Sequence, residues 1–310
     1  MSLKNIALVG ASGTLGPSIL SALKSHPTFN PFVINRHSSK SVYPKTRVIT
    51  VPDDLNVAEL TKLFKDKEID ALVIAIAGSR VDEQKKLIEA AYEAGVYRVV
   101  PADFGSCDSA DEETVRLFPL YEKKKEIRDL LVLYASKARG KGNALEPLTW
   151  TSLISGHFFD WGLKGDLLKF DVKARKAYIL DGGNVMSSGS SLAFIADALV
   201  KILEKPDETK NKIVYVHGVY KTQNEILDLL EKATGEKFER IEQSSKEIME
   251  RVGPSMREGD QESYLEAVAT WGVVSADWKE KGGFANEMLG LEEEDAEAVV
   301  KRVVKELKVE

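Results

Sequence analysis

The sequence contains little cysteine and little histidine. Among its 310 residues there is one cysteine, Cys107, and the four histidines lie singly along the chain. One cysteine excludes an intramolecular disulfide and a zinc cluster built from cysteines. The histidines show no HxxxH or comparable ligand spacing, so we expect no bound metal.

Long apolar runs and an excess of positive charge are also missing. The longest apolar run, residues 71–77, is far shorter than the roughly 20 residues that a membrane-spanning helix needs. The chain has 43 Lys and Arg against 49 Asp and Glu, which gives a net charge of -6 and a pI near 5.5. This balance argues against a broad surface for nucleic acid or anionic lipid. We therefore expect a cytoplasmic protein with no nucleic-acid or membrane partner.

Strand-like and helix-like patterns alternate in the first half of the chain. Short apolar runs predict buried strands, and the amphipathic segments between them predict helices. The predicted strands cover residues 6–9, 31–35, 47–51, 70–77 and 97–101, and the clearest helices begin at Gly16, Val57 and Asp82. This order is typical of βαβ units around a parallel sheet. We predict a Rossmann, doubly wound α/β domain over residues 1–155, with ligands at the carboxyl ends of its strands.

The second half of the chain, residues 156–310, alternates less regularly. We interpret it as a smaller α/β substrate-binding region that can contribute a strand or helix to the first domain. The other predicted elements are a long charged helix at 119–138, a loop at 137–143, strands at 149–155 and 212–218, and helices at 191–206, 222–237 and 291–307. The charged stretch 244–266 is also predicted to be helical.

Three glycines with the spacing GxxGxxG follow the first predicted strand. They lie in the segment GASGTLG, directly before the first predicted helix. Glycine lets the backbone approach a pyrophosphate, and a helix N-terminus offers free N–H groups and a positive dipole end. The spacing differs from the usual GxGxxG, and a plain glycine-rich turn is the alternative. We favour a cofactor site formed by Gly10, Ser12, Gly13, Thr14, Leu15 and Gly16.

The end of the second predicted strand indicates which dinucleotide is bound. An acidic residue that binds the ribose is expected about 20 residues after the glycines. That position, counted from Gly16, holds Arg36, and no carboxylate occurs between Val33 and Lys40. A guanidinium suits a 2'-phosphate, which an acidic residue would repel. We therefore predict NADP(H), bound by Arg36 and Lys40, over NAD(H); the alternative is a solvated basic loop.

Several segments together resemble one known family. GASGTLG, VINRHSSK, PADFG at 101–105 and YEKKKEIRDLL at 121–131 are similar to motifs of the isoflavone reductase-like enzymes. These enzymes are atypical short-chain dehydrogenases, grouped with the NmrA-like proteins, and the chain resembles a fungal-type member. The resemblance implies a Rossmann domain, a smaller substrate domain and NADPH-dependent reduction of phenylpropanoid or related aromatic compounds. It also implies that Lys124 is the catalytic lysine of a KxxIR helix motif.

A rival assignment lies in the same predicted helix. Tyr121 and Lys125 form YxxxK, which resembles the tyrosine and lysine pair of ordinary short-chain dehydrogenases. We favour Lys124 because Ile127 and Arg128 follow it at the spacing of the resembled family. Adjacent residues on a helix point about 100° apart, so both assignments cannot hold in one geometry. A solvated, lysine-rich helix face is the third interpretation.

Other candidate positions follow further strands of the chain. Ala77, Gly78 and Ser79 come after the fourth strand and are expected at the cofactor, and the matching family loop implies the same for Asp103 and Phe104. Aromatic residues follow the strand at 149–155, and they suit a flat aromatic substrate as well as a core. These predicted substrate-binding residues are His157, Phe158, Phe159 and Trp161.

These observations favour an NADPH-dependent reductase of a small aromatic or carbonyl-bearing substrate, working as a monomer or homodimer. A lysine in a cationic or apolar site has its pKa lowered and can act as general acid or base, the role we predict for Lys124. The alternative is a non-catalytic, NmrA-like NADP(H) sensor that binds a protein partner. An epimerase or dehydratase that uses Tyr121, Lys125 and NAD is a third possibility, and Arg36 argues against it.

Overall fold

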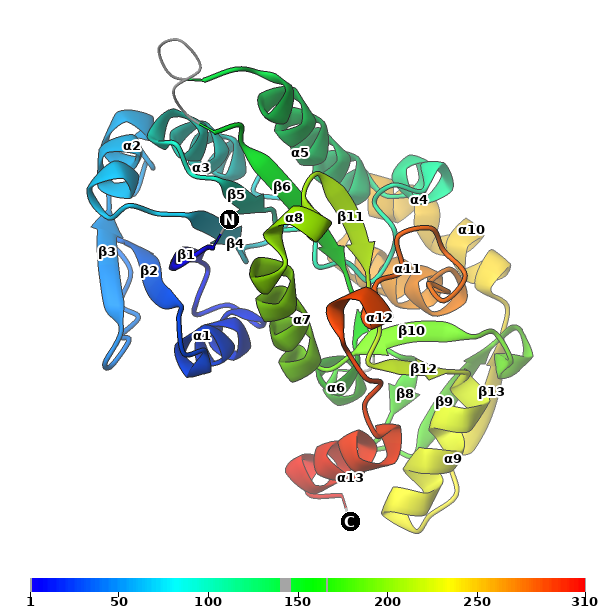
Figure 1. The fold of residues 1–310 in the computed structure, drawn as a ribbon. Coiled ribbons are helices and arrows are strands. Elements are labelled where there is room, and N and C mark those ends of the chain that lie inside the picture. Colours follow the sequence, from blue (N-terminus) through cyan, green and yellow to red (C-terminus); the bar gives the residue numbers. More distant parts are fainter. Residues whose placement is uncertain (1, 140–145, 166, 310) are drawn as a thin grey trace. The chain divides into compact units, whose positions relative to one another are not determined.

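The computed structural model describes residues 2–139, 146–165 and 167–309 (Figure 1). Most of the predicted loop at 137–143 lies outside these described residues. The chain forms two compact units. The first consists of residues 1–104, 120–153 and 196–214, and the second consists of residues 105–119, 154–195 and 215–310.

A seven-stranded sheet forms the centre of the first unit within the described residues. Its order is β11-β6-β5-β4-β1-β2-β3. The strands are β1 (Asn5–Val9), β2 (Asn30–Arg36), β3 (Arg47–Val51), β4 (Ala71–Ile74), β5 (Arg98–Val100), β6 (Thr149–Ile154) and β11 (Lys212–Tyr215). The pairs β1–β2, β1–β4, β2–β3, β4–β5 and β5–β6 are all parallel. The strand order reverses between β1 and β4, which confirms the predicted Rossmann fold.

Helices cover both faces of this sheet. They are α1 (Gly16–Ser25), α2 (Val57–Asp66), α3 (Val81–Ala94), α5 (Pro119–Ser136), α7 (Leu192–Glu204) and α8 (Pro206–Thr209). Leu60, Leu87 and Leu131 of α2, α3 and α5 share one core cluster with Leu72 of β4. In Figure 1, α1 and α7 lie on the other face. The sheet is therefore doubly wound, and its loops meet at the carboxyl ends of the strands.

A buried arginine attaches α8 to the sheet. The Arg98 side chain is fully buried, and it donates to the hydroxyls of Thr149 at 2.9 Å, Thr151 at 2.8 Å and Thr209 at 3.0 Å. It also donates to the backbone carbonyl of Pro206. Burial lowers the pKa of Arg98 to about 10. The hydroxyl and carbonyl acceptors offset the cost of removing the guanidinium from water.

The second unit contains two three-stranded sheets in its described residues, with the orders β12-β10-β7 and β13-β9-β8. Its strands are β7 (His157–Phe158), β8 (Phe170–Asp171), β9 (Lys176–Leu180), β10 (Ser187–Ser190), β12 (Val219–Lys221) and β13 (Glu239–Gln243). Its helices are α4 (Glu112–Leu117), α6 (Phe159–Lys164), a 3-10 turn (Asp181–Gly183), α9 (Gln223–Thr234), α10 (Ser245–Arg257), α11 (Gln261–Val274), α12 (Asn286–Leu289) and α13 (Ala296–Leu307). A core cluster joins Phe170, Ile179, Leu230 and Val300.

The stretch over 244–266, which was predicted to be helical, is helical but not one continuous helix. The chain forms two helices there, because Gly259 adopts a φ of 97° between α10 and α11. Asp260 then caps α11 by accepting a hydrogen bond from the N–H of Ser263 at 2.7 Å. The C-terminal helix likewise begins at Ala296, after its cap Asp295, and not at 291 as predicted. Caps and a left-handed glycine therefore overrode the helical charge pattern.

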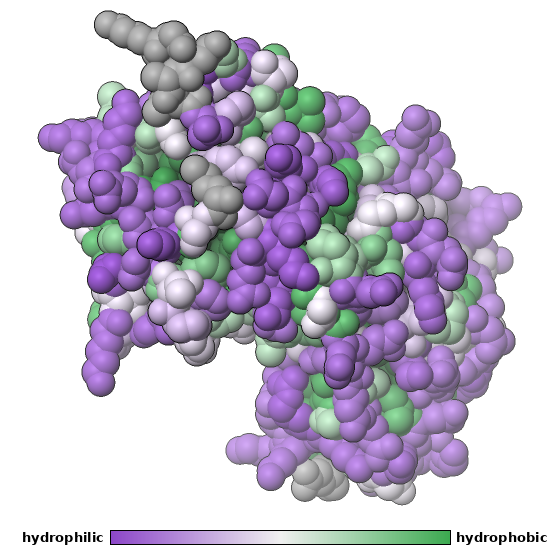
Figure 2. Space-filling model, in the orientation of Figure 1, coloured by the Kyte–Doolittle hydropathy of each residue, from purple (hydrophilic) through white to green (hydrophobic). Residues whose placement is uncertain are grey.

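Hydrophilic residues dominate the visible surface in Figure 2, with hydrophobic residues interspersed among them in small groups. Within the part of the chain that the structure describes, no helix combines the length and the apolar character that crossing a membrane requires.

Candidate functional site

The glycine turn is so tight that its first and third glycines leave no room for a side chain. Gly10 has a φ of 87°, and a Cβ atom built on it would lie 2.2 Å from the carbonyl oxygen of Ala75. A Cβ atom on Gly16 would lie 2.2 Å from the carbonyl oxygen of Gly10. Gly13 is exposed, and its N–H donates to that same oxygen at 3.0 Å. The turn therefore presents bare backbone in front of α1.

The N-terminus of α1 is suited to an anion. Leu15 precedes the helix and has an apolar side chain, so it cannot cap the first N–H groups. The first turn contains Pro17 and no acidic residue. Ser12 and Thr14 are exposed beside Gly13, whereas Leu15 is buried. Free N–H groups and the positive end of the helix dipole thus face the exposed part of the turn.

The basic loop after β2 is held by an acidic residue that the sequence analysis did not identify. Arg36 ends β2 and is exposed, as is Lys40 in the loop. Asp53, which follows β3, accepts hydrogen bonds from the N–H of Ser38 at 3.0 Å and from its hydroxyl at 2.8 Å. These bonds hold the pKa of Asp53 below its usual value. Asp53 therefore fixes the turn that presents Arg36 and Lys40.

Lys124 is buried where β4 and β5 end. Its residue is 9% exposed, and its ammonium donates to the backbone carbonyl of Asp103 at 3.1 Å. The same nitrogen lies 3.7 Å from Oδ1 of Asp103 and 5.0 Å from the ring centre of Tyr121. A Cβ atom on Gly78 would lie 3.0 Å from Cε of Lys124. The structure thus brings together Gly78, Asp103 and Lys124, three predicted site residues from distant parts of the sequence.

The Asp103 carboxylate is held from its other side as well. Asp103 is 2% exposed, and its Oδ2 atom accepts a hydrogen bond from the hydroxyl of Ser152 on β6. Nη1 of Arg128 lies 3.6 Å from the same oxygen, and the Arg128 residue is 7% exposed. Lys124 and Arg128 are four residues apart, so both lie on the buried face of α5.

The rival lysine lies on another face of α5. Lys125 is exposed and forms an ion pair with Asp129 at 2.6 Å, and Lys123 is exposed too. Tyr121 is buried, with 1% exposure, and its ring lies beside Lys124. The geometry therefore associates Tyr121 with Lys124. Which residue is catalytic stays a prediction.

A buried glutamine connects the loops after β4 and β5. Gln84 of α3 is 1% exposed; it donates to the carbonyl of Gly78 at 3.4 Å and accepts from the N–H of Ala102 at 3.1 Å. Ala77 and Ser79 next to Gly78 are exposed, and Phe104 is half-buried. Gln84 thus sets the spacing of the two loops that carry predicted cofactor-binding residues.

The predicted substrate-binding residues lie in the second unit and differ in exposure. His157 and Phe159 are buried, with 3% and 2% exposure, and Phe159 belongs to the core of that unit. Burial lowers the pKa of His157 to about 4. Phe158 is half-buried, Trp161 is 42% exposed, and their ring centres lie 6.4 Å apart. Phe158 and Trp161 are thus the accessible members of this set.

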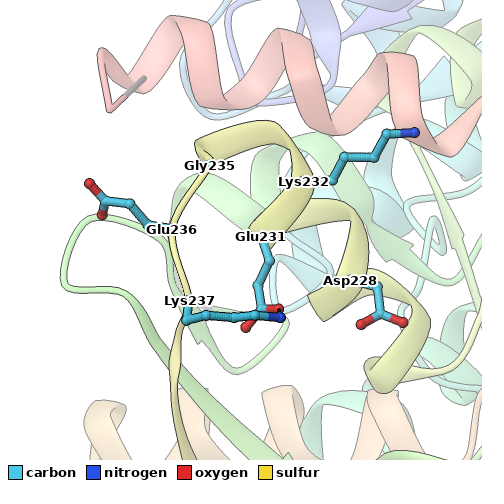
Figure 3. Close-up of a pocket in the computed structure, with 6 residues that line it drawn as sticks. All are labelled: Asp228, Glu231, Lys232, Gly235, Glu236 and Lys237. Carbon is cyan, nitrogen blue, oxygen red and sulfur yellow. Dashed lines mark hydrogen bonds and ion pairs between the residues drawn. The ribbon is translucent and has the colours of Figure 1, made fainter.

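A hollow of about 370 Å³ at the end of α9 offers no comparable chemistry (Figure 3). Its lining is mostly charged, and four of the five charges form ion pairs: Lys237 with Glu231, Lys232 with Glu297 at 2.7 Å, and Glu236 with Arg175 at 2.8 Å. Among residues 2–139, 146–165 and 167–309, no group of three His, Cys, Asp or Glu side chains is placed to hold a metal ion.

Sequence reasoning missed Asp53, Gln84 and Ser152, and it used Arg128 only as a family marker. One of these had a signal, since Asp53 comes shortly after a strand. Ser152 had none, because Thr149 and Thr151 carry hydroxyls in the same strand. Gln84 had none, because a glutamine in the first turns of a helix is usually exposed.

Comparisons with known proteins agree with this geometry. The NmrA-like family matches residues 2–135, which include the glycine turn and Lys124. The oxidoreductase aprR of Aspergillus flavus is 29% identical over 314 residues, covering 97% of this chain and 98% of that protein. The isoflavone reductase of Medicago sativa is 26% identical over 218 residues, covering 69% and 64% of the two chains. The solved structure of AtPrR2 with NADP+ and (+)pinoresinol is 21% identical, with a TM-score of 0.77, and covers 98% of this chain and 99% of that chain.

The sheet order and the glycine turn at its switch point define a doubly wound Rossmann fold. Over residues 2–135 the chain matches the NmrA-like family, and it is similar to the oxidoreductase aprR and to isoflavone reductases, as its motifs predicted.

Proposed function

We propose that this protein is an NADPH-dependent reductase that transfers hydride to a small aromatic or carbonyl-bearing substrate, with Lys124 as general acid or base. The position of Lys124 carries the proposal. Its ammonium is buried beside Gly78 and Asp103, on the sheet edge that also holds the glycine turn. A buried titratable group at the ligand-binding edge of a parallel sheet is a candidate for proton transfer.

The first unit fits a dinucleotide phosphate. The bare backbone at Gly10 and Gly16 and the uncapped start of α1 suit a pyrophosphate. Arg36 and Lys40, held on a turn that Asp53 fixes, suit the 2'-phosphate of NADP(H). Bound NADPH supplies the hydride, so the protein has to orient the substrate, exclude water and manage the proton.

We propose that Lys124 transfers that proton at its Nζ atom. The carbonyl of Asp103 and the ring of Tyr121 orient the ammonium, and Gly78 leaves the space for its stem. A protonated Nζ donates to a substrate oxygen on which negative charge develops, and an unprotonated Nζ accepts a proton in the reverse direction. Burial strengthens both effects because water does not screen the charge.

The relatives support an aromatic substrate class. One relative is an isoflavone reductase, and the solved structure of AtPrR2 contains NADP+ together with (+)pinoresinol. We propose a phenylpropanoid-like or carbonyl-bearing compound as the substrate of this chain, with Phe158 and Trp161, the accessible members of the predicted set, as its candidate binding residues. We further propose that the protein is cytoplasmic and works as a monomer or homodimer, which light scattering after size exclusion will distinguish.

Cofactor binding is the first test, and it needs no substrate. Calorimetric titrations with NADPH, NADP+, NADH and NAD+ should show a preference for the phosphorylated pair. Arg36→Ala should weaken NADPH binding about tenfold or more and leave NADH binding unchanged, because it removes a charge-assisted bond. Arg116→Ala, at an exposed arginine of the second unit, is the matched control. A preference for NAD(H) would contradict the role of Arg36.

Turnover is the second test. A panel of aromatic and carbonyl compounds is screened by NADPH consumption with the native chain, Lys124→Ala, Lys125→Ala and Tyr121→Phe. We expect Lys124→Ala to lose turnover and Lys125→Ala to keep it. Full turnover in Lys124→Ala with loss in Tyr121→Phe would reverse the assignment. NADPH binding without turnover of any compound would favour the non-catalytic regulator.

A further inference from the structure

Asp53 lies beside the basic loop, on the strand that is further from the glycine turn. β2 and β3 pair in parallel with Arg36 opposite Val51, so both strands end at the same edge of the sheet. The N–H of His37 donates to the carbonyl of Val51 at 3.0 Å, which extends this pairing by one residue. The sheet order β1-β2-β3 puts the end of β2, with Arg36, between the glycine turn and the strand that leads into Asp53.

Both hydrogen bonds between Ser38 and Asp53 end on one oxygen. Oδ1 of Asp53 accepts from the N–H of Ser38 at 3.0 Å and from its hydroxyl at 2.8 Å. The N–H of Ser39 donates to the carbonyl of Arg36 at 3.0 Å, which closes the turn. The hydrogen bonds from Ser38 and, to a smaller extent, the charge of Arg36 lower the pKa of Asp53. The loop is therefore ordered through contacts that an uncharged oxygen can also make.

We propose that Asp53 is a positioning residue that determines the preference for NADP(H), because its hydrogen bonds order the turn that carries Arg36 and Lys40. This inference rests on the proposed dinucleotide site and assigns it a residue from another strand. An ordered loop loses less conformational freedom when the 2'-phosphate binds, so it binds that phosphate more tightly. NADH has no 2'-phosphate, so its affinity does not depend on the order of this loop.

The charge of Asp53 acts against its hydrogen bonds in this role. A carboxylate near Arg36 offsets part of the positive charge of the guanidinium and repels a phosphate. Asp53 and Arg36 are both exposed, so water and salt screen this repulsion. The hydrogen bonds with Ser38 instead fix the backbone of the turn directly. We therefore expect the ordering effect of Asp53 to exceed the repulsion.

Direct binding of the adenosine ribose is the rival role for Asp53. A ribose-binding acid is expected about 20 residues after the glycines, where this chain has Arg36 at the end of β2. Asp53 instead follows β3, which lies two strand spacings, or about 10 Å, from β1. The two roles predict opposite results. Loss of a ribose-binding acid weakens NADH binding, whereas loss of the positioning residue weakens NADPH binding alone.

Calorimetry on the full chain separates charge from hydrogen bonding through two variants of the same residue. Asp53→Asn removes the charge and keeps an oxygen that can accept both bonds from Ser38, whereas Asp53→Ala removes the charge and the acceptor. We expect Asp53→Ala to bind NADPH about fivefold or more weakly than Asp53→Asn, because the hydrogen bonds are lost. NADH should bind equally to both variants. Asp54→Ala, at the neighbouring exposed acid, is the matched control and should bind both cofactors like the native chain.

A second pair of ligands repeats the comparison without the nicotinamide half. Adenosine 2',5'-bisphosphate and 5'-AMP differ only in the 2'-phosphate, so the ratio of their dissociation constants reports the binding of that phosphate. The preference for the bisphosphate should fall in Asp53→Ala and should be at least native in Asp53→Asn. A merely structural role predicts a lower Tm in Asp53→Ala with an equal loss of affinity for both nucleotides.

The proposal is overturned if Asp53→Ala and Asp53→Asn bind NADPH equally, or if either variant loses more affinity for NADH than for NADPH. A native chain without preference for the 2'-phosphate overturns it too. Failure of the proposed reductase gives a different result: the expected differences in binding, with no turnover of any compound in the panel, reject the reductase and keep the role of Asp53. Turnover with equal NADPH affinities in the two variants does the opposite.

Discussion

The imidazole of His157 lies directly against Gly272 of α11. A Cβ atom built on Gly272 would come 2.2 Å from Nε2 and 2.7 Å from Cε1 of His157. Nε2 is buried and has no hydrogen-bond partner in the described residues. The imidazole does form a hydrogen bond with the backbone of Ala269. The helix can therefore approach β7 only because position 272 has no side chain.

Gly272→Ala should destabilise the protein by about 1–3 kcal/mol, the usual cost of overpacking. Alanine within a helix normally stabilises by about 0.5–1 kcal/mol relative to glycine. A lower free energy of unfolding in Gly272→Ala would therefore indicate the contact with His157. Urea unfolding monitored by circular dichroism measures it. Gly282→Ala, at a glycine with open space around it, is the control. A double variant with His157→Ala should lose less stability than the sum of the two single variants.

His157 should make the protein acid-sensitive. Burial lowers its folded-state pKa to about 4 from 6.5, so the unfolded chain binds a proton below pH 6.5 that the folded chain does not accept until about pH 4. Stability from this group is complete above pH 6.5 and falls by about 3 kcal/mol as the pH approaches 4. His157→Gln lacks this dependence. Between pH 7 and pH 4 the free energy of unfolding of the native chain should therefore fall by about 3 kcal/mol more than that of the variant. Equal changes in the two proteins over this pH range would contradict the prediction.

Gly13→Ala should separate cofactor binding from folding. Its Cβ atom would lie 3.3 Å from the carbonyl oxygen of Gly10, a tight contact without the positive φ of Gly10. We expect a nearly native Tm and NADPH affinity reduced at least about tenfold, or about 1.4 kcal/mol, because the methyl group occupies the phosphate cradle. Gly10→Ala should lose both folding stability and binding. Unchanged NADPH affinity in Gly13→Ala, measured by calorimetry, would exclude this turn as the phosphate site.

Gly78→Ala should reduce turnover more than cofactor binding. The added Cβ would lie 3.0 Å from Cε of Lys124 and 3.4 Å from the carbonyl oxygen of Ala102, so the lysine stem has to shift. Small displacements of a catalytic group cost up to about a hundredfold in rate, and we expect at least about a tenfold fall in kcat. Steady-state kinetics with a substrate from the screen measures it, with Lys123→Ala as the exposed control. Equal kcat values for Gly78→Ala and the native chain would argue against this packing.

Much of the fold followed from local patterns. Strands β1 to β5 are short apolar runs and the helices between them are amphipathic, so residue spacing alone predicted a parallel sheet. The break between α10 and α11 was also present in the sequence as Gly259 and Asp260. The small sheets of the second unit were not predicted, because most of their strands lack the continuous apolar runs that mark β1 to β5.

The residues of the candidate site also divide into those that local sequence patterns predicted and those that only the packing revealed. Glycine spacing identified Gly10, Gly13 and Gly16. A turn that packs closely against neighbouring backbone requires residues without Cβ, and these lie close together in the sequence. The KxxIR motif identified Lys124, and helical geometry explains why Lys124 is buried while Lys125 pairs with Asp129. Gln84 and Ser152 contact Ala102 and Asp103, which lie 18 and 49 residues away from them in the sequence, so no local pattern marked them.

The sequence by itself determined the order of strands and helices, the backbone turn before α1 and the basic residue after β2, because each depends on residues close together along the chain. Only the tertiary structure brought the Asp103 carboxylate together with Ser152 of β6 and with Lys124 and Arg128 of α5. It also decided that His157 is buried against Gly272. Such contacts depend on how distant segments pack, and burial then determines the strength of each charge and hydrogen bond.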